Sequence, residues 1–143
     1  MLEYQKILNK NMLNVFKDII TNIRDNGLSD NNQLYITFNT SHQNVELPNW
    51  LKQKYPQEMT IVIQYEYYDL KINKNNFSIS LSFNNIKTNL KIDYNSIISF
   101  ADPSANFGLI LQKNEIQNKI KNKLEHKGEK NNNVIDFSDY KKN

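Results

Sequence analysis

Residues 59–83 constrain the fold of this chain more than any other part of its sequence. β-branched and aromatic residues are frequent in this stretch, and none of its residues is glycine or proline, so it favours strands. From 77 to 83, Phe, Ile, Leu and Phe alternate with three serines. That alternation places four apolar side chains on one face and three hydroxyls on the other. We therefore predict a hairpin in which arms 59–72 and 77–83 flank a turn at 73–76.

Shorter segments around the hairpin predict the rest of a small sheet. Residues 34–38 and 107–111 favour a first and a last strand, and 42–47 a loop with a short strand. Asn84 and Asn85 tolerate positive φ, so they fit a tight turn into a strand at 86–92.

Two short helical turns are also predicted. Trp50, Leu51 and Tyr55 fit one turn that ends at Pro56. We expect Asp93 to cap a second helical turn that runs through Ile97, Ile98 and Phe100 and is broken at 102–104.

The N-terminal residues 2–24 predict one amphipathic helix, and Gly27 suits the left-handed position that follows it, with Leu28 as its hydrophobic contact. The apolar stripe covers roughly half of the circumference, more than one packing face needs. Either the helix is set deeply on its own sheet, or one edge packs on the sheet and the other on a second chain. The stripe consists of Tyr4, Ile7, Leu8, Met12, Val15, Phe16, Ile19, Ile20 and Ile23.

Composition narrows the class of protein. A length of 143 residues suggests one domain. The net charge of +3 is spread along the chain, unlike the basic stripe of a nucleic-acid-binding protein. Because there is no cysteine, we expect neither disulfides nor a thiolate metal site. The N-terminus has no continuous apolar run, so we expect a cytoplasmic protein without a signal peptide or membrane span.

No pattern of residues predicts catalysis. The two histidines, His42 and His126, are far apart, and the glycines form no phosphate-binding loop. Glu66 and Asp69 are close enough in sequence for a pair of catalytic carboxylates, but solvated charges on a strand are the interpretation we favour. We therefore expect a protein that is not an enzyme and uses no cofactor or metal.

The C-terminal segment divides into two parts. Residues 113–133 are mostly Lys, Asn, Glu and Gln, which predicts a frayed helix and then a flexible linker. Residues 134–143 then bring four large apolar side chains into a short stretch. A short docking motif on a tether is the interpretation we favour over an ordinary terminal strand.

Several blocks of the sequence, in order and at matching spacing, resemble the SspB (stringent starvation protein B) family, and its alphaproteobacterial branch most closely. The resemblance covers roughly residues 2–112, and the tail resembles the C-terminal motif of that branch. Asn84-Asn85 departs from a turn that often carries Gly, and Tyr67-Tyr68 from positions that often carry Trp or Phe. The blocks are 34–38 (LYITF), 45–48 (VELP), 55–64 (YPQEMTIVIQ), 68–71 (YDLK), 77–83 (FSISLSF), 101–104 (ADPS) and 107–109 (FGL).

The resemblance implies an adaptor for the ClpXP unfoldase–protease. Its fold would be mainly β with an N-terminal helix: helix 2–24 and a small Sm-like β-barrel within a tag-binding domain at 1–112, usually paired into a homodimer through the helix. A groove on each barrel would hold the tag that tmRNA adds to stalled chains. A flexible linker, 113–133, would carry a motif at 134–143 that docks on the N-terminal zinc domain of ClpX.

Matching the family onto this sequence gives three candidate sites. The peptide groove would lie between the strands at 61–68 and 78–83, where the serine face admits an extended backbone; a plain solvated face is the other interpretation. A small-barrel RNA-binding protein is the alternative function. The residues are Ile63, Tyr65, Tyr67, Ser80, Leu81 and Ser82 for the peptide; Val134, Ile135, Phe137, Tyr140, Lys141 and Lys142 for ClpX; and Leu8, Met12, Phe16 and Ile19 for the dimer.

Overall fold

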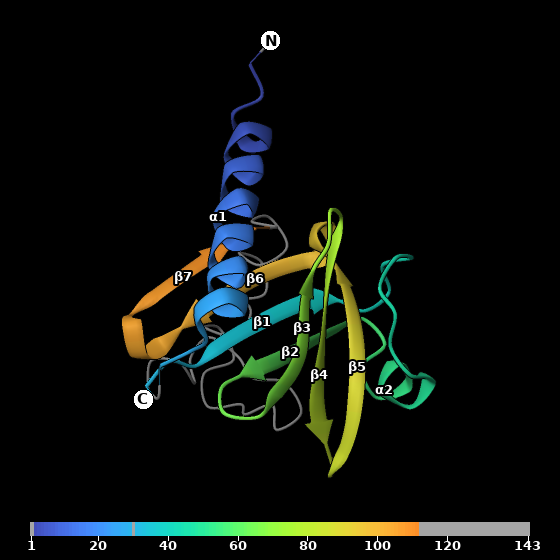
Figure 1. The fold of residues 1–143 in the computed structure, drawn as a ribbon. Coiled ribbons are helices and arrows are strands. Elements are labelled where there is room, and N and C mark those ends of the chain that lie inside the picture. The colour runs from blue at the N-terminus through green and yellow to red at the C-terminus, as the bar shows by residue number, and fades with distance from the viewer. Residues whose placement is uncertain (1, 30, 112–143) are drawn as a thin grey trace, which may run out of the picture.

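The computed structural model describes residues 2–29 and 31–111 and contains one long helix and two antiparallel sheets (Figure 1). One sheet has the strand order β2-β1-β6-β7, and the other has the order β3-β4-β5. The elements are α1 (Tyr4–Asn26), β1 (Leu34–Asn39), α2 (Asn49–Lys54), β2 (Glu58–Ile63), β3 (Tyr67–Ile72), β4 (Asn76–Phe83), β5 (Ile86–Asp93), the 3-10 turn η1 (Tyr94–Ser96), β6 (Ile97–Asp102), the 3-10 turn η2 (Pro103–Ala105) and β7 (Phe107–Ile110).

The mainly β fold with an N-terminal helix is confirmed, but its two sheets do not form a closed barrel within the described residues. The predicted linker 113–133 and the tail motif 134–143 lie outside the part of the chain that the structure describes.

The prediction of one strand over 59–72 is wrong. Strand β2 ends at Ile63, and β3 begins at Tyr67 in the other sheet. A single strand of that length would extend about 46 Å, well beyond the usual size of a strand in a small domain. Interrupting the run at 64–66 lets its two halves pack on opposite sides of one core, and only β3 and β4 form the predicted hairpin.

The turn predictions are confirmed in part. Asn84 and Asn85 both have positive φ and join β4 to β5. Gly27 has φ +77° but an extended ψ of 178°, so it follows the helix without the left-handed helical conformation. Asp93 caps a turn by accepting from the backbone N–H of Asn95, but the turn ends at Ser96. The expected helical continuation through Ile97, Ile98 and Phe100 is wrong because these residues form β6.

Helix α1 closes the core between the two sheets. Its buried residues are Phe16, Ile20 and Ile23, all in its second half. The ring of Phe16 lies 5.7 Å from that of Phe77 on β4 and 5.2 Å from that of Phe100 on β6, measured between centroids. One side chain of the helix therefore contacts both sheets, and its exposed fraction is 0%.

We expect Phe16→Ala to lower the free energy of unfolding by about 3–5 kcal/mol, because it leaves a cavity among rings from both sheets. The matched control is Asn14→Ala, an exposed position on the same helix, which should change stability by no more than about 0.5 kcal/mol. Urea unfolding of both variants measures the difference, and equal stabilities would contradict this role for Phe16.

Candidate functional site

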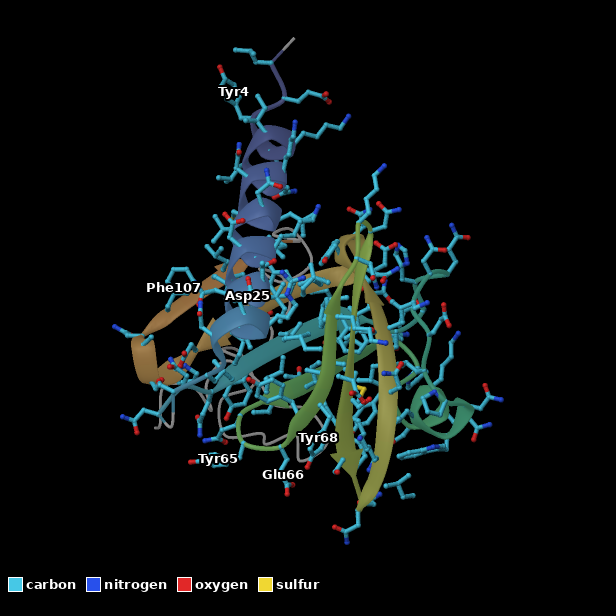
Figure 2. The ribbon with its side chains drawn as sticks, in the orientation of Figure 1. Tyr4, Asp25, Tyr65, Glu66, Tyr68 and Phe107 are labelled. Atoms are coloured by element: carbon cyan, nitrogen blue, oxygen red, sulfur yellow. The ribbon has the colours of Figure 1, made fainter. Side chains whose placement is uncertain are left out.

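An exposed aromatic turn joins the two sheets. Residues 64–66 connect β2 to β3, and the side chain of Tyr65 in this turn is 73% exposed. Tyr68, just inside β3, is 42% exposed, whereas Tyr67 is half-buried against the core. Figure 2 shows Tyr65, Glu66 and Tyr68 together at the end of the molecule opposite Tyr4. Two tyrosine rings are thus available to a partner at the start of β3.

Tyr68 lies on the outer face of the three-stranded sheet, beside a lysine that is itself paired with a carboxylate. Lys87 Nζ lies 4.5 Å from the centroid of the Tyr68 ring and 3.8 Å from Asp69 Oδ2. Asp69 has φ +54°, and the pairing of β3 with β4 shifts register between Tyr68 and Lys71. Such a bulge turns a strand and re-aims its side chains. Asp69 is thus an exposed ion-pair partner, which gives no support to a catalytic pair with Glu66.

The predicted serine face is the outer face of this sheet. In the β4–β5 register Ser78 lies opposite Lys91, Ser80 opposite Asn89, and Ser82 opposite Lys87. Asn89 Nδ2 donates to Ser80 Oγ over 3.1 Å. Ser78 and Ser80 are buried between their larger neighbours, and only Ser82 is exposed. The face therefore offers a shallow serine row between higher lysine and tyrosine side chains.

The predicted peptide-binding residues do not share one surface. Ile63 and Leu81 belong to the hydrophobic core, and Tyr67 faces the core opposite Leu81. Tyr65, Ser82 and the buried but outward-facing Ser80 remain as candidates. Because β3 and β4 are directly paired, the predicted groove cannot lie between residues 67–68 and β4.

Sequence reasoning missed three side chains on the outer face. Tyr68 pairs with Ser80, Lys71 pairs with Ser78, and Lys87 pairs with Ser82. The alternation of β5 around Thr88 and Leu90 already put Lys87 on the polar face. Tyr68 could not be identified from the sequence, because two tyrosines are adjacent and the sequence does not say which one points outward.

A second exposed surface lies along α1. Tyr4 is 74% exposed, Leu8 is 47% exposed, and Ile7 and Val15 are also exposed. Figure 1 shows that the first half of α1 projects beyond both sheets. Of the predicted dimer residues, Leu8 is exposed, and Met12 and Ile19 are half-buried. Phe16 is fully buried in its own chain, so its assignment to an interface is wrong: the sequence stripe merged the core edge with the exposed edge.

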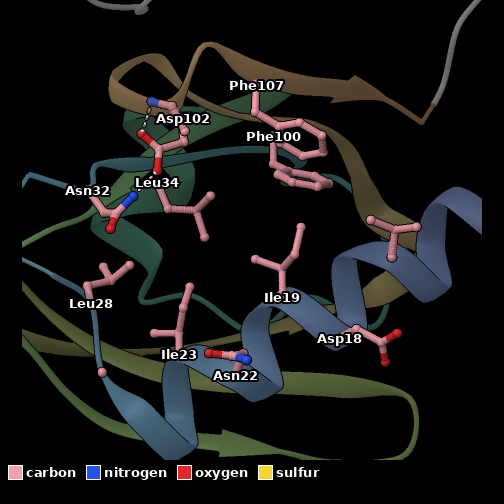
Figure 3. Close-up of a pocket in the computed structure, with 13 residues that line it drawn as sticks. Asp18, Ile19, Asn22, Ile23, Leu28, Asn32, Leu34, Phe100, Asp102 and Phe107 are labelled. Atoms are coloured by element: carbon pink, nitrogen blue, oxygen red, sulfur yellow. Dashed lines mark hydrogen bonds between the residues drawn. The ribbon is translucent and has the colours of Figure 1, made fainter.

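A groove runs between the second half of α1 and the ends of β1, β6 and β7 (Figure 3). Its volume is about 510 Å³, within the usual range for binding pockets. Its apolar wall comprises Val15, Ile19, Ile23, Leu28, Leu34, Phe100, Ala105 and Phe107, and its polar positions are Asp18, Asn22, Asn32 and Asp102.

Asp102 fixes the strand side of this groove. Its carboxylate accepts from the Ser104 hydroxyl at 2.6 Å and from Asn32 Nδ2 at 2.6 Å. Burial raises the pKa of Asp102, but the hydrogen bonds from Ser104, Asn32, Gln33 and Ala105 together outweigh it and lower that pKa below its ordinary value. The charged form therefore ties the start of β1 to η2, which sets the shape of that wall.

Other classes of site receive no support from the described residues. In the described ranges no group of three or more His, Asp or Glu side chains is placed to hold a metal ion. Nor does any helix there have both the length and the apolar character needed to cross a membrane.

Comparison with known proteins identifies the family. The model of the family described as SspB, stringent starvation protein B, matches residues 7–142. Since this match covers most of the chain, the protein belongs to the SspB family. A search of curated proteins finds no match.

Proposed function

We propose that the chain is an adaptor that binds tmRNA-tagged polypeptides and delivers them to ClpXP. The observation that carries this proposal is the family match over 7–142, which includes both the folded body and nearly all of the tail motif. SspB proteins act in general as protease adaptors. An adaptor needs a client site, a contact with the protease and a link between them, but no catalytic group.

The client site we propose is the aromatic turn together with the adjoining outer face of β3 and β4. Tyr65 and Tyr68 supply exposed rings, and Ser82 supplies an exposed hydroxyl beside Lys87. An extended peptide lying along the shallow serine row would gain apolar contact with the rings and hydrogen bonds from the polar groups. Two observations support this placement: both tyrosine rings are exposed, and Tyr68 and Ser82 lie on the same outer face of the three-stranded sheet.

We expect Tyr65→Ser and Tyr68→Ser each to weaken binding of a labelled tmRNA-tag peptide about tenfold, because each removes a ring that would be buried by the peptide. Ser82→Gln should weaken it as well by filling the serine row. The control is Tyr4→Ser, which removes an equally exposed ring from the opposite end of the molecule. Fluorescence anisotropy measures the affinities, and unchanged binding in all three test variants would place the site elsewhere.

Single-stranded RNA is the alternative ligand for this face. Exposed tyrosines beside lysines resemble a stacking platform, and Lys71, Lys87 and Lys91 all lie on this side of the sheet. However, Lys87 is paired with Asp69 and Lys91 with Glu46, which reduces the positive charge available to phosphates. The same anisotropy titration with labelled RNA in place of the peptide separates the two functions.

We also propose that the chain is a homodimer joined through the exposed edge of α1. All three buried residues of this 23-residue helix lie at Phe16 or later. The first half has little support from its own chain, and helices of that length are marginal in water without packing. Tyr4, Ile7 and Leu8 give this half an apolar edge, and a second copy offers the same edge in return.

We expect the unmodified chain to have the mass of a dimer in light scattering at micromolar concentration. Leu8→Glu should give the mass of a monomer, because a charge would then be buried without a partner at the seam. Leu8 is exposed in the single chain, so this variant should keep its fold. Lys10→Glu, on the polar side of α1, is the control and should remain dimeric. A monomeric mass for the unmodified chain would refute this assembly.

The contact with the protease would be made by the tail motif. Val134, Ile135, Phe137 and Tyr140 are the groups there that can bury appreciable apolar area, and Lys141 and Lys142 would aid encounter. We propose that they dock on the N-terminal zinc domain of ClpX, with 113–133 as the link to the body. Tethering raises the effective client concentration at the unfoldase to roughly the millimolar range.

Deleting residues 134–143 should abolish the stimulated degradation of a tagged substrate and leave its affinity for the adaptor unchanged. The reason is that the two contacts lie on separate parts of the chain. Degradation by ClpXP and peptide binding are measured on the same preparation, so that a damaged body shows itself in the binding assay. If the truncated chain accelerates degradation as well as the full chain does, the tail has no delivery role.

A further inference from the structure

The groove between α1 and β7 has the chemistry of a site for a short apolar peptide. Its walls come from two sides, with Val15 and Ile19 on the helix and Phe100 and Phe107 on the strands (Figure 3). The two phenylalanine rings lie 5.9 Å apart between centroids. Asp18 and Asn22 line the helix side, and Asp18 forms no ion pair with any residue that the structure describes. An occupant with apolar side chains followed by a basic group would match these walls.

We propose that the occupant is the chain's own C-terminal motif, residues 134–142. The described chain ends at Leu111, directly after β7, the strand that forms one wall of the groove. Twenty-two residues separate Leu111 from Val134, and a random coil of that length has an r.m.s. end-to-end distance of roughly 23–28 Å. The motif can therefore reach the groove from its own point of attachment.

The order of residues in the motif matches the groove. Val134, Ile135 and Phe137 supply apolar side chains to meet Ile19 and Phe107. Lys141 and Lys142 follow them and bring positive charge toward Asp18, which offsets the two carboxylates of the motif, Asp136 and Asp139. Because the motif is attached to the same chain, even a weak contact is occupied for much of the time at an effective concentration in the millimolar range.

A second copy of the body fits the groove less well than the tail does. In a symmetric pair the same surfaces meet, so two grooves facing each other would bring Asp18 and Asp102 of both copies together. Like charges at an interface oppose association. The exposed edge at Tyr4 and Leu8, on the other half of α1, carries no carboxylate of its own and remains available for a second copy.

Docking of the tail would restrain delivery. A motif held in the groove is not free to bind another protein, so the body competes with the unfoldase for the same apolar side chains. The groove also lies close to β3: a Cβ added at Gly27, which lines it, would be 4.0 Å from the hydroxyl oxygen of Tyr67. The groove thus lies next to β3, the strand that carries Tyr68.

The absence of cysteine allows a direct test in the full chain. Asn22→Cys places a thiol in the groove at an exposed position, and Ser138→Cys places one beside Phe137 in the motif. The control pair keeps Ser138→Cys and uses Lys74→Cys, an exposed residue in the turn between β3 and β4. Under mild oxidation we expect the groove pair to form an intrachain disulfide at least tenfold faster than the control pair.

Adding Phe137→Ser to the groove pair should remove this advantage, because it deletes a large apolar side chain of the motif without altering the folded body. Non-reducing gels separate an intrachain product from a product of twice the mass. Equal rates for the two cysteine pairs would overturn the proposal, as would a product of mainly twice the mass, which would assign the groove to a second copy. The assay contains no ClpX, so its result is independent of the proposed delivery function.

Discussion

The packing of Phe16 between the two sheets is the contact on which the rest of the structure depends. The four-stranded and three-stranded sheets share no strand. Side chains from α1 must therefore pack against the inner faces of both sheets. Phe16 reaches Phe77 on one sheet and Phe100 on the other, and Ile20 and Ile23 extend the same face of α1. Because the core uses this face, the opposite edge of the helix is left exposed. Both the projecting edge at Leu8 and the groove beside Ile19 are consequences of that single placement.

Local sequence patterns correctly predicted those elements whose conformation depends mainly on neighbouring residues. Alternation predicted β4 and β5, and two consecutive asparagines predicted the turn between them, with the positive φ that the turn requires. The prediction failed at 64–66, where strand-favouring residues continue although the chain changes sheets. Nothing in a run of β-branched and aromatic residues marks that change, since it is set by how much length a small core can cover.

The side chains of the candidate sites were harder still to predict from local sequence patterns. An apolar stripe reveals that Leu8 and Phe16 lie on related faces of a helix, but not which edge the sheets will cover. On β3, one residue decides whether Tyr67 or Tyr68 points to the core, because each step along a strand reverses the face. The bulge at Asp69 adds a further register shift that no alternation predicts. The sequence therefore located the strands of the candidate site, while the identity of their exposed side chains required the structure.

The arrangement of α1 also bears on how separate weak contacts can act together. Its first half has an exposed apolar edge, its second half forms a wall of the groove, and its end at Gly27 lies near Tyr67 on the strand of the proposed client site. A helix packed on both sheets transmits displacement poorly by bending, since close-packed interiors resist deformation. Control of delivery would therefore act through competition between the groove and the unfoldase for the same tethered motif, whose local concentration is set by the tether. Such control requires no movement of the body and no catalytic residue, only affinities weak enough to be displaced.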